Sequence, residues 1–407
     1  MLGVNEEKYG VCMFRRQMKK ELMNMATQYP VVTLTGPRQS GKTTLVKEVF
    51  SEKPYVNLES LRSLEFAETD PIGFLDSYPD GVILDEIQKC PKLLSEIQAR
   101  VDALQQKGMF ILTGSHQTKS HQVELHSAIA QSLAGRTSIL HLLPMSIEEL
   151  QNEGIFFSLD EIVYKGCFPR IFKDKLEPTK AYSNYVQTYL ERDLRQMIEV
   201  KNLQLFQKFL KLCAGRIGQI FNKENIAGEV GVSAKTITQW LSVLEASYLI
   251  FLLPPYYENF GKRVIKSPKL YFCDVGLAAF LLGIENISQV ERDPLRGNLV
   301  ENLIILELIK QRWNQGLEHK LSFFRDSSHN EVDVLFQNGH NLIPIEIKSA
   351  KTFNRSFLKG LRSFQKPVGE RCQNPTVVYG GSEEHKVNDV QVIHFSHTSR
   401  VLPNHLL

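Results

Sequence analysis

The sequence predicts an α/β protein of three domains, with boundaries near residues 200 and 285. Its 407 residues exceed what one compact core usually holds, and a content of 43% hydrophobic and 23% charged residues is typical of globular chains. From about residue 31 to 142, short continuous apolar runs alternate with helical stretches, which predicts a parallel sheet covered by helices on both faces. Three amphipathic helices follow, and then a second mixture of helices and strands. We therefore expect domains at 1–200, 201–285 and 286–407.

The composition excludes several classes of protein. The formal net charge of +3 is too small for the whole protein to attract a polyanion, although it does not exclude a local basic face. The six cysteines form no CxxC pair, so neither a zinc ribbon nor a disulfide framework is expected. No apolar run approaches the roughly eighteen residues of a membrane span. We expect a soluble, cytoplasmic protein with no membrane partner.

The first domain takes its strands from five runs of β-branched and aliphatic residues. Pro144 then begins a helical, aromatic-rich extension that reaches about residue 200. The five predicted strands are Val31–Thr35, Tyr55–Leu58, Val82–Leu84, Phe110–Thr113 and Ser138–Leu142.

The second domain has the pattern of a winged helix-turn-helix, and Ser233 is placed as the N-cap of its third helix. Residues 201–265 carry eight basic and four acidic side chains, a net charge of 8 − 4 = +4. Winged helices bind DNA, but they also dock proteins and act as lids in ATPases, and the sequence leaves these alternatives open. The helices are expected at 203–217, 222–232 and 233–250, with strands near Phe251 and at Lys269–Phe272.

The third domain is expected to be a small α/β unit that begins with a long helix at Gly297–Trp313. Its strands Glu331–Phe336 and Leu342–Lys348 are predicted to form a hairpin, because Asn338-Gly339 between them is a strong turn signal. The other strands are expected at Leu321–Phe324, Thr376–Tyr379 and Val390–Phe395.

Residues 36–43 match the phosphate-loop pattern G-x-x-x-x-G-K-[ST] without departure, after a strand and before a helix. Glycines let such a loop turn its N–H groups toward phosphate oxygens at a helix N-terminus. Lys42 is expected to reach the β- and γ-phosphates, and the Thr43 hydroxyl to coordinate Mg²⁺. The sequence therefore predicts a P-loop NTPase domain with ATP and Mg²⁺ as cofactors. The nucleotide-binding residues are Gly36, Pro37, Arg38, Gln39, Ser40, Gly41, Lys42, Thr43 and Thr44.

Further catalytic candidates follow the later strands of this domain. Asp85 is expected to hold Mg²⁺ and Glu86 to orient and polarise the attacking water, because both follow an apolar strand at the sheet edge that carries the loop. Thr113 and Ser115 are candidates for sensing the γ-phosphate. Arg136 is the first choice for an arginine that stabilises the transition state, and it requires a homo-oligomer if it acts on a neighbouring chain. The alternatives to it are Arg170, Arg192 and Arg195.

These motifs resemble those of the predicted AAA-type ATPases of bacteria and archaea that carry a C-terminal domain of unknown function. The resemblance implies ATP binding and hydrolysis, and a restriction-endonuclease-like fold for the C-terminal domain. The segments that carry it lie between residues 31 and about 350: GPRQSGKTTL, VILDEIQKCP, FILTGSHQ, SLAGR, LLPMSIEEL, YLERDL, GNLVENLI, EVDVLF and PIEIKSA.

Four residues of the third domain form a candidate nuclease site. Alternation along the strand places Glu346 and Lys348 on one face, with Asp333 on the preceding strand and Glu301 in the long helix. Asp333 and Glu346 are expected to hold Mg²⁺, with all three carboxylates close enough to share it, while Lys348 stabilises or activates the attacking water. A site kept only for binding, and a hairpin face on which Asp333 pairs with Lys348, remain alternatives.

Two functions of different class follow from these motifs. The first is Mg²⁺-dependent ATP hydrolysis coupled to a DNA-binding and DNA-cleaving C-terminal module. The second is a nucleotide-dependent switch or scaffold that binds a protein partner without nuclease activity.

Overall fold

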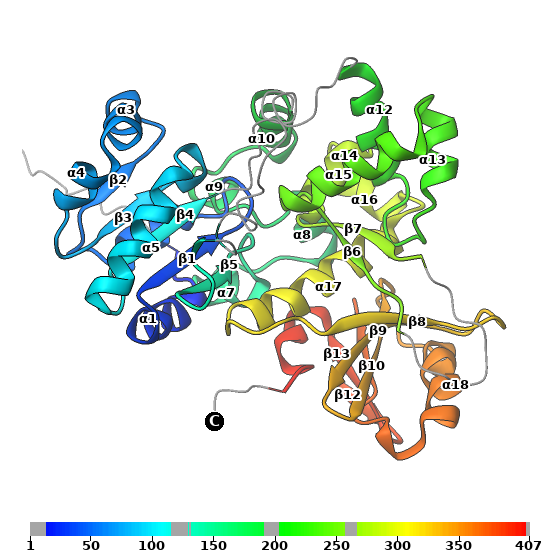
Figure 1. Ribbon diagram of the computed structural model, residues 1–407. Helices are drawn as coiled ribbons and strands as arrows, with labels where there is room; N and C mark the ends of the chain where they lie inside the picture. The colour runs from blue at the N-terminus through cyan, green and yellow to red at the C-terminus, as the bar shows by residue number, and fades with distance from the viewer. Residues whose placement is uncertain (1–13, 115–128, 130–131, 191–202, 257–266, 404–407) are drawn as a thin grey trace, which may run out of the picture.

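The computed structural model describes residues 14–114, 129, 132–190, 203–256 and 267–403 of the chain (Figure 1). A parallel sheet lies at one end of the molecule, helices of the middle segment lie beside it, and a mixed sheet closes the other end. The long helix α17 (Arg296–Trp313) runs through the region where these parts meet. No helix among the described residues is long and apolar enough to span a bilayer.

The first sheet has the strand order β2-β3-β4-β1-β5, and all of its neighbouring strands are parallel, as the continuous apolar runs predicted. One face packs against α1 and α2, and the other against α3, α4 and α5. This burial on both faces explains why the strands have no polar alternation. The elements are α1 (Met18–Gln28), β1 (Val31–Thr35), α2 (Lys42–Val49), β2 (Tyr55–Asn57), α3 (Leu61–Thr69), α4 (Pro71–Asp76), β3 (Val82–Asp85), the 3₁₀ turn η1 (Ile87–Lys89), α5 (Lys92–Leu104), β4 (Phe110–Gly114) and β5 (Thr137–His141).

The middle segment is a helical core with one antiparallel strand pair, β6 with β7. From Leu143 onward, the helices α7–α10 share one apolar core with α12–α15. The helices expected as an extension of the first domain therefore pack with the second. The elements are α7 (Ile147–Asn152), α8 (Leu159–Lys165), α9 (Pro169–Lys173), α10 (Pro178–Tyr185) with its π-helical continuation η2 (Val186–Leu190), α12 (Leu203–Ala214), α13 (Lys223–Val230), α14 (Ala234–Ala246), β6 (Ile250–Leu253), β7 (Lys269–Phe272), α15 (Val275–Leu281) and α16 (Ile287–Arg292).

The C-terminal sheet is mixed, with the strand order β12-β13-β11-β10-β9-β8. The strands β8, β9 and β10 pair antiparallel, β10 with β11 and β11 with β13 pair parallel, and α17 and α18 cover opposite faces. The hairpin between β9 and β10 was predicted, whereas β12 was not. The elements after α17 are β8 (Leu321–Arg325), β9 (Glu331–Asn338), β10 (Asn341–Lys348), η3 (Arg355–Leu358), α18 (Lys359–Val368), η4 (Gly369–Arg371), β11 (Thr376–Tyr379), β12 (His385–Val387), β13 (Val390–His394) and η5 (Phe395–Arg400).

The helix α17 lies in an apolar core that the middle and C-terminal segments share. It contacts α8 and α15 of the middle segment and also β10 and η5 of the C-terminal part. Twelve of its eighteen residues are buried, including every residue from Asn302 to Lys310. A helix that is buried on all sides needs neighbours on all sides. The middle and C-terminal segments are therefore joined through a shared interior.

Candidate functional site

The phosphate loop connects β1 to α2 at the carboxyl edge of the parallel sheet. Gly36 has a φ of +150°, and a Cβ there would lie 2.1 Å from the carbonyl oxygen of Leu142. Gly41 has a φ of +94° and stands immediately before α2. Only glycine fits the first position without displacing backbone, and the second position favours glycine through its left-handed conformation.

Lys42 is folded back over the loop. Its Nζ donates to the carbonyl oxygens of Gly36 at 2.9 Å and Pro37 at 2.7 Å. Burial lowers the pKa of Lys42 to about 8, against the opposite effects of Glu86 and Asp85. Because this buried ammonium donates to carbonyl oxygens and not to a carboxylate, it is available to bind an anion in the loop.

Asp85 lies where a metal ligand was predicted. It is buried, and its carboxylate accepts hydrogen bonds from the Thr43 hydroxyl at 3.0 Å, the Tyr55 hydroxyl at 2.7 Å and the Thr113 hydroxyl. Burial, and then the bond to Asp85, raise the pKa of Tyr55. Tyr55 was not among the predicted site residues, because its only signal in the sequence is its place at the start of the strand beside β3. The two predicted metal ligands, Thr43 and Asp85, are therefore in direct contact.

Glu86 follows β3 in a left-handed conformation, with a φ of 59°. This conformation is uncommon for a residue with a side chain, and it turns the chain from β3 into η1. The amide of Gln88 donates to the Glu86 carboxylate. Ser115, Arg192 and Arg195 lie outside the described residues.

Arg136 does not reach the nucleotide loop of its own chain. Its carbonyl accepts from the N–H of Val31, so it stands at the start of β1, whereas the loop follows the end of β1, about 13 Å away. Its guanidinium donates to both carboxylate oxygens of Asp102, at 2.5 and 2.8 Å. Within a single chain, Arg136 is therefore held by Asp102 at the end of the sheet opposite to the loop.

Two pockets adjoin the loop, and both include helix α9. The first is lined by Phe14, Arg16, Gly41, Thr44, Leu45, Glu48, Pro169 and Lys173. The second is lined in part by Gln39 of the loop, Tyr182 and Arg170. Arg170, one of the alternatives to Arg136, is thus beside the loop, where it pairs with Asp174 at 3.0 Å.

Three residues of the predicted nuclease site, Asp333, Glu346 and Lys348, come together at the open end of the β9–β10 hairpin. Ile345 pairs with Val334, so the next positions along the ladder, Glu346 and Asp333, stand opposite each other. The Lys348 ammonium lies 2.6 Å from Glu346 and 3.7 Å from Asp333. Burial, and then the neighbouring Asp333, raise the pKa of Glu346 well above its usual range.

A second lysine, which the sequence analysis missed, enters this cluster from β7. Lys269 is buried, and its ammonium lies 3.0 Å from Glu301 and 2.6 Å from Glu331. The Tyr271 hydroxyl also donates to Glu301. Burial alone would lower the pKa of Lys269, but the surrounding carboxylates raise it. No local pattern marks Lys269, because its partners lie more than thirty positions away.

The expected three-carboxylate metal site is not formed. Among the described residues, no three His, Cys, Asp or Glu side chains gather in a group that could hold a metal ion. Instead, the Lys348 ammonium bridges Asp333 and Glu346, and the Lys269 ammonium bridges Glu301 and Glu331. One atom, Oε2 of Glu346, is buried with no hydrogen-bond partner.

The basic face expected on the middle segment is partly used within the chain. Lys208 donates to the carbonyl oxygen of Glu229, and the Arg216 guanidinium donates to its carboxylate. Ser233 caps α14 as predicted, accepting from the N–H of Thr236 at 3.1 Å, and Lys235 beside it is exposed.

Comparison with known families divides the chain into three matched regions. Residues 28–151 match the model of an AAA domain. Residues 157–288 match a domain of unknown function (DUF8612), and residues 296–398 match another (DUF4143). The second match begins near the point where packing changes from the sheet to the helical core.

The chain also resembles whole proteins of known sequence. An uncharacterized protein of Mycobacterium tuberculosis is 27% identical over 381 residues, which cover 93% of this chain and 82% of that protein. An uncharacterized protein of Methanocaldococcus jannaschii is 25% identical over 383 residues, which cover 83% of this chain and 80% of that one.

The similarity to solved structures is weaker than the similarity to these sequences. The Walker-type ATPase PABY2304 of Pyrococcus abyssi is 15% identical, with a TM-score of 0.44 over 66% of this chain and 96% of that one. Protein VC1899 of Vibrio cholerae is 12% identical, with a TM-score of 0.21 over 91% of this chain and 96% of that one. The AAA-domain match over residues 28–151 and the geometry of the loop nevertheless agree, and both support a P-loop ATPase domain in the first part of this chain.

Proposed function

We propose that the protein binds Mg²⁺-ATP in the loop at residues 36–43 and hydrolyses it to ADP and phosphate. The observation that carries this proposal is the contact between Thr43 and Asp85 beside the buried ammonium of Lys42. A hydroxyl and a carboxylate are the oxygen ligands that Mg²⁺ takes in P-loop enzymes. When bound, the metal neutralises charge on the phosphates.

The residues of the chain have separate roles in this reaction. The backbone N–H groups of the loop and the Lys42 ammonium bind the β- and γ-phosphates, with Thr43 and Asp85 holding the metal. Glu86 orients a water and accepts its proton as the water oxygen bonds to the γ-phosphorus. The bond from that phosphorus to the β–γ bridging oxygen breaks, and ADP leaves. Ser115, which follows β4 in the sequence, is proposed as the γ-phosphate sensor.

The nucleobase is proposed to lie in the pocket beside α2. This pocket joins the end of the loop, at Gly41 and Thr44, to the apolar side chains of Phe14, Leu45 and Pro169. A mostly apolar pocket next to a phosphate site suits a purine ring.

Arg170 replaces Arg136 as the arginine that we propose for the transition state. It lies on α9 beside Gln39 of the loop, whereas Arg136 is held by Asp102 at the opposite edge of the sheet. Arg170→Ala is expected to lower turnover at least tenfold with ATP binding retained, and Arg136→Ala to leave turnover within twofold of wild type. Equal loss in both variants, or loss only in Arg136→Ala, would contradict this assignment.

Two substitutions test the ATPase itself. Lys42→Ala is expected to abolish ATP binding, because it removes the cation for the phosphates. Glu86→Gln is expected to bind ATP normally and hydrolyse it at least a hundredfold more slowly, because size is kept while the base is lost. Titration calorimetry and phosphate release on the full chain measure both. Wild-type turnover by Glu86→Gln would show that Glu86 is not the base.

We further propose that ATP hydrolysis is coupled to DNA bound by the middle and C-terminal segments. Support comes from the order of α12–α14 followed by a strand pair, which is that of a winged helix, and from the exposed Lys235 at the start of α14. The order α17-β8-β9-β10-α18-β11, with Asp333, Glu346 and Lys348 at one hairpin end, is compatible with an endonuclease-like fold. DNA at saturation is expected to stimulate ATP turnover.

A second candidate function, a nucleotide-dependent switch that docks a protein, is favoured by one observation. Each carboxylate that a nuclease would use already has an ammonium partner: Lys348 pairs with Asp333 and Glu346, and Lys269 pairs with Glu301. Incubation of linear and single-stranded DNA with the full chain, Mn²⁺ and ATP separates the two functions. Cleavage that is lost in Asp333→Asn supports the nuclease, whereas absence of cleavage and of DNA-stimulated turnover supports the switch.

A further inference from the structure

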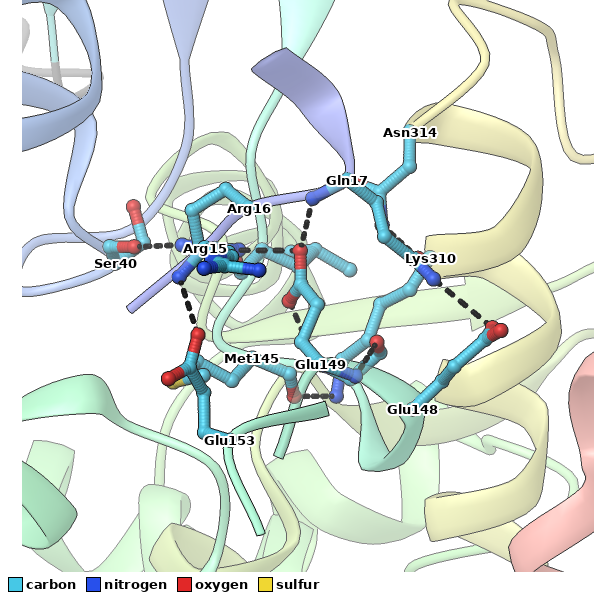
Figure 2. A network of polar contacts seen from close by, with 12 residues as sticks. Arg15, Arg16, Gln17, Ser40, Met145, Glu148, Glu149, Glu153, Lys310 and Asn314 are labelled. Atoms are coloured by element: carbon cyan, nitrogen blue, oxygen red, sulfur yellow. Dashed lines mark hydrogen bonds and ion pairs between the residues drawn. The ribbon is translucent and has the colours of Figure 1, made fainter. Parts of the chain in front are cut away.

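A buried arginine lies directly behind the phosphate loop. Arg16, just before α1, donates from its guanidinium to the carbonyl oxygen of Ser40 at 2.6 Å and to that of Leu143 at 2.7 Å (Figure 2). Its Nε donates to the Glu149 carboxylate at 3.1 Å. All three contacts join segments that are distant in sequence, and the Arg16 side chain is only 6% exposed.

The contact with Ser40 bears on phosphate binding through the geometry of one peptide group. In a trans peptide the C=O and the following N–H point in opposite directions. Arg16 holds the Ser40 carbonyl on the outer side of the loop, so the N–H of Gly41 is directed to the inner side. That N–H is among the donors that a phosphate loop offers to its ligand. Gly41, with little steric restriction, would otherwise allow this peptide to rotate.

The guanidinium is itself held by a rigid acid. Glu149 is 1% exposed and stands in the first turn of α7. Its Oε2 accepts from the N–H of Ser146 at 2.9 Å, and its own N–H donates to the Ser146 hydroxyl at 3.0 Å, a reciprocal cap. Its Oε1 accepts from the N–H of Gln17 as well as from Arg16.

The same turn of α7 is fastened to α17. Glu307 accepts from the N–H of Ile147 at 2.7 Å, and Lys310 donates to the carbonyl oxygen of Met145 at 2.7 Å (Figure 2 shows Met145 and Lys310). Arg16 therefore connects the loop to the first turn of α7, which is in turn fixed against the helix shared by the middle and C-terminal cores.

We propose that Arg16 is a positioning residue for nucleotide binding, which orients the Ser40–Gly41 peptide of the loop against the support of Glu149. The inference rests on the proposed binding of ATP by this loop. In this role Arg16 acts through the backbone of the loop, and its side chain also forms part of the lining of the pocket proposed for the nucleobase. A planar guanidinium suits the task because it donates to two carbonyls and a carboxylate at once, whereas a lysine ammonium has no such fork.

The test compares ATP dissociation constants, measured by titration calorimetry on full-length chains well below their unfolding temperatures. Arg16→Ala is expected to weaken ATP binding about a hundredfold, and Arg16→Lys about tenfold. Arg15→Ala is the matched control, because the Arg15 side chain is exposed and its contact with Glu153 uses only the backbone N–H. Its dissociation constant is expected within twofold of wild type.

Chemical rescue distinguishes positioning from a merely structural role. Millimolar guanidinium is expected to restore ATP affinity to Arg16→Ala at least fivefold, because the vacated site keeps two carbonyls and the carboxylate of Glu149. Ammonium at the same concentration should restore less than twofold. The double variant Arg16→Ala with Glu149→Gln should not respond to guanidinium.

The outcomes are distinct. Wild-type protein that fails to bind ATP would overturn the proposed function. Wild-type binding that is lost in Lys42→Ala but unchanged in Arg16→Ala would overturn only the inference on Arg16. A lower unfolding temperature for Arg16→Ala, with a wild-type dissociation constant and no response to guanidinium, would make Arg16 structural and also overturn it.

Discussion

The ammonium of Lys42 is unusual among lysines because it is buried and bonded to carbonyl oxygens rather than to a carboxylate. Because its pKa is about 8, ATP binding is expected to depend on pH around pH 8. Below pH 8 the free protein already carries the proton that the phosphates require. Above pH 8 the free protein loses it, whereas the ATP complex retains it, so binding must take up a proton.

We therefore predict that the dissociation constant for ATP is flat up to about pH 7.5 and then rises toward about tenfold per pH unit above 8. Calorimetry between pH 7 and 9 in buffers of different ionisation enthalpy measures both the rise and the proton uptake. Arg136→Ala serves as a control that leaves the profile unchanged. A dissociation constant that stays constant to pH 9 in the wild-type protein would refute the prediction.

At this scale, the sequence predicts those site residues that belong to contiguous patterns. The loop at residues 36–43 and the pair Asp85 and Glu86 are local patterns, and Thr43 meets Asp85 because parallel strands end at one edge. Arg16 and Lys269 were missed since each acts on partners far along the chain, and an isolated basic residue has no periodicity that could mark it.

At the scale of elements, β7 is tied to α17 and β9 by one cation. Lys269 on β7 neutralises Glu301 on α17 and Glu331 on β9 in a buried setting. Removing one partner of a buried ion pair leaves a charge without compensation, which costs much more than the pair contributed. The strand pair is thereby fixed against the C-terminal sheet.

Lys269→Met is accordingly expected to lower the free energy of unfolding by about 3 kcal/mol or more. The matched control is Lys351→Met, because Lys351 forms an exposed pair with Glu291 at 3.9 Å and its loss is expected to cost under about 0.5 kcal/mol. Denaturant unfolding of the full chain measures both. Adding Glu301→Gln to Lys269→Met should recover part of the loss, and equal effects of the two lysine substitutions would contradict the buried charge argument.

Elements with a strong period or turn signal were predicted well. The β9–β10 hairpin follows from apolar runs around Asn338-Gly339, and the structure lengthens its strands by one or two residues. The placement of α7–α10 was not predictable from sequence. An amphipathic pattern predicts that a helix has a buried face, but it does not indicate which core covers that face.

For the whole molecule, α17 determines which pieces of the chain can fold separately. The match to the C-terminal domain of unknown function begins at residue 296, which is also the first residue of α17. A fragment of residues 296–407 would expose the side of α17 that packs on α8 and α15.

We predict that residues 296–407 alone do not unfold cooperatively and bind a hydrophobic dye, whereas residues 143–407 unfold in one cooperative transition. The longer fragment keeps the helical core from Leu143 onward together with both sides of α17. Calorimetry measures whether each fragment unfolds cooperatively, and dye fluorescence measures its exposed apolar surface. A sharp transition in the shorter fragment would mean that α17 needs only the C-terminal sheet.

The position of α17 also sets an order of events during synthesis. The ribosome releases the chain from its N-terminus, so the helices from α7 to α16 emerge before the helix that completes their interior. Until residue 313 has left the exit tunnel, this helical core lacks one wall and presents apolar side chains to solvent or to a chaperone. The parallel sheet before it carries its own two cores and has no such dependence. Nascent chains stalled before and after α17 should therefore differ sharply in protease resistance over residues 143–292, while residues 14–114 are equally protected in both.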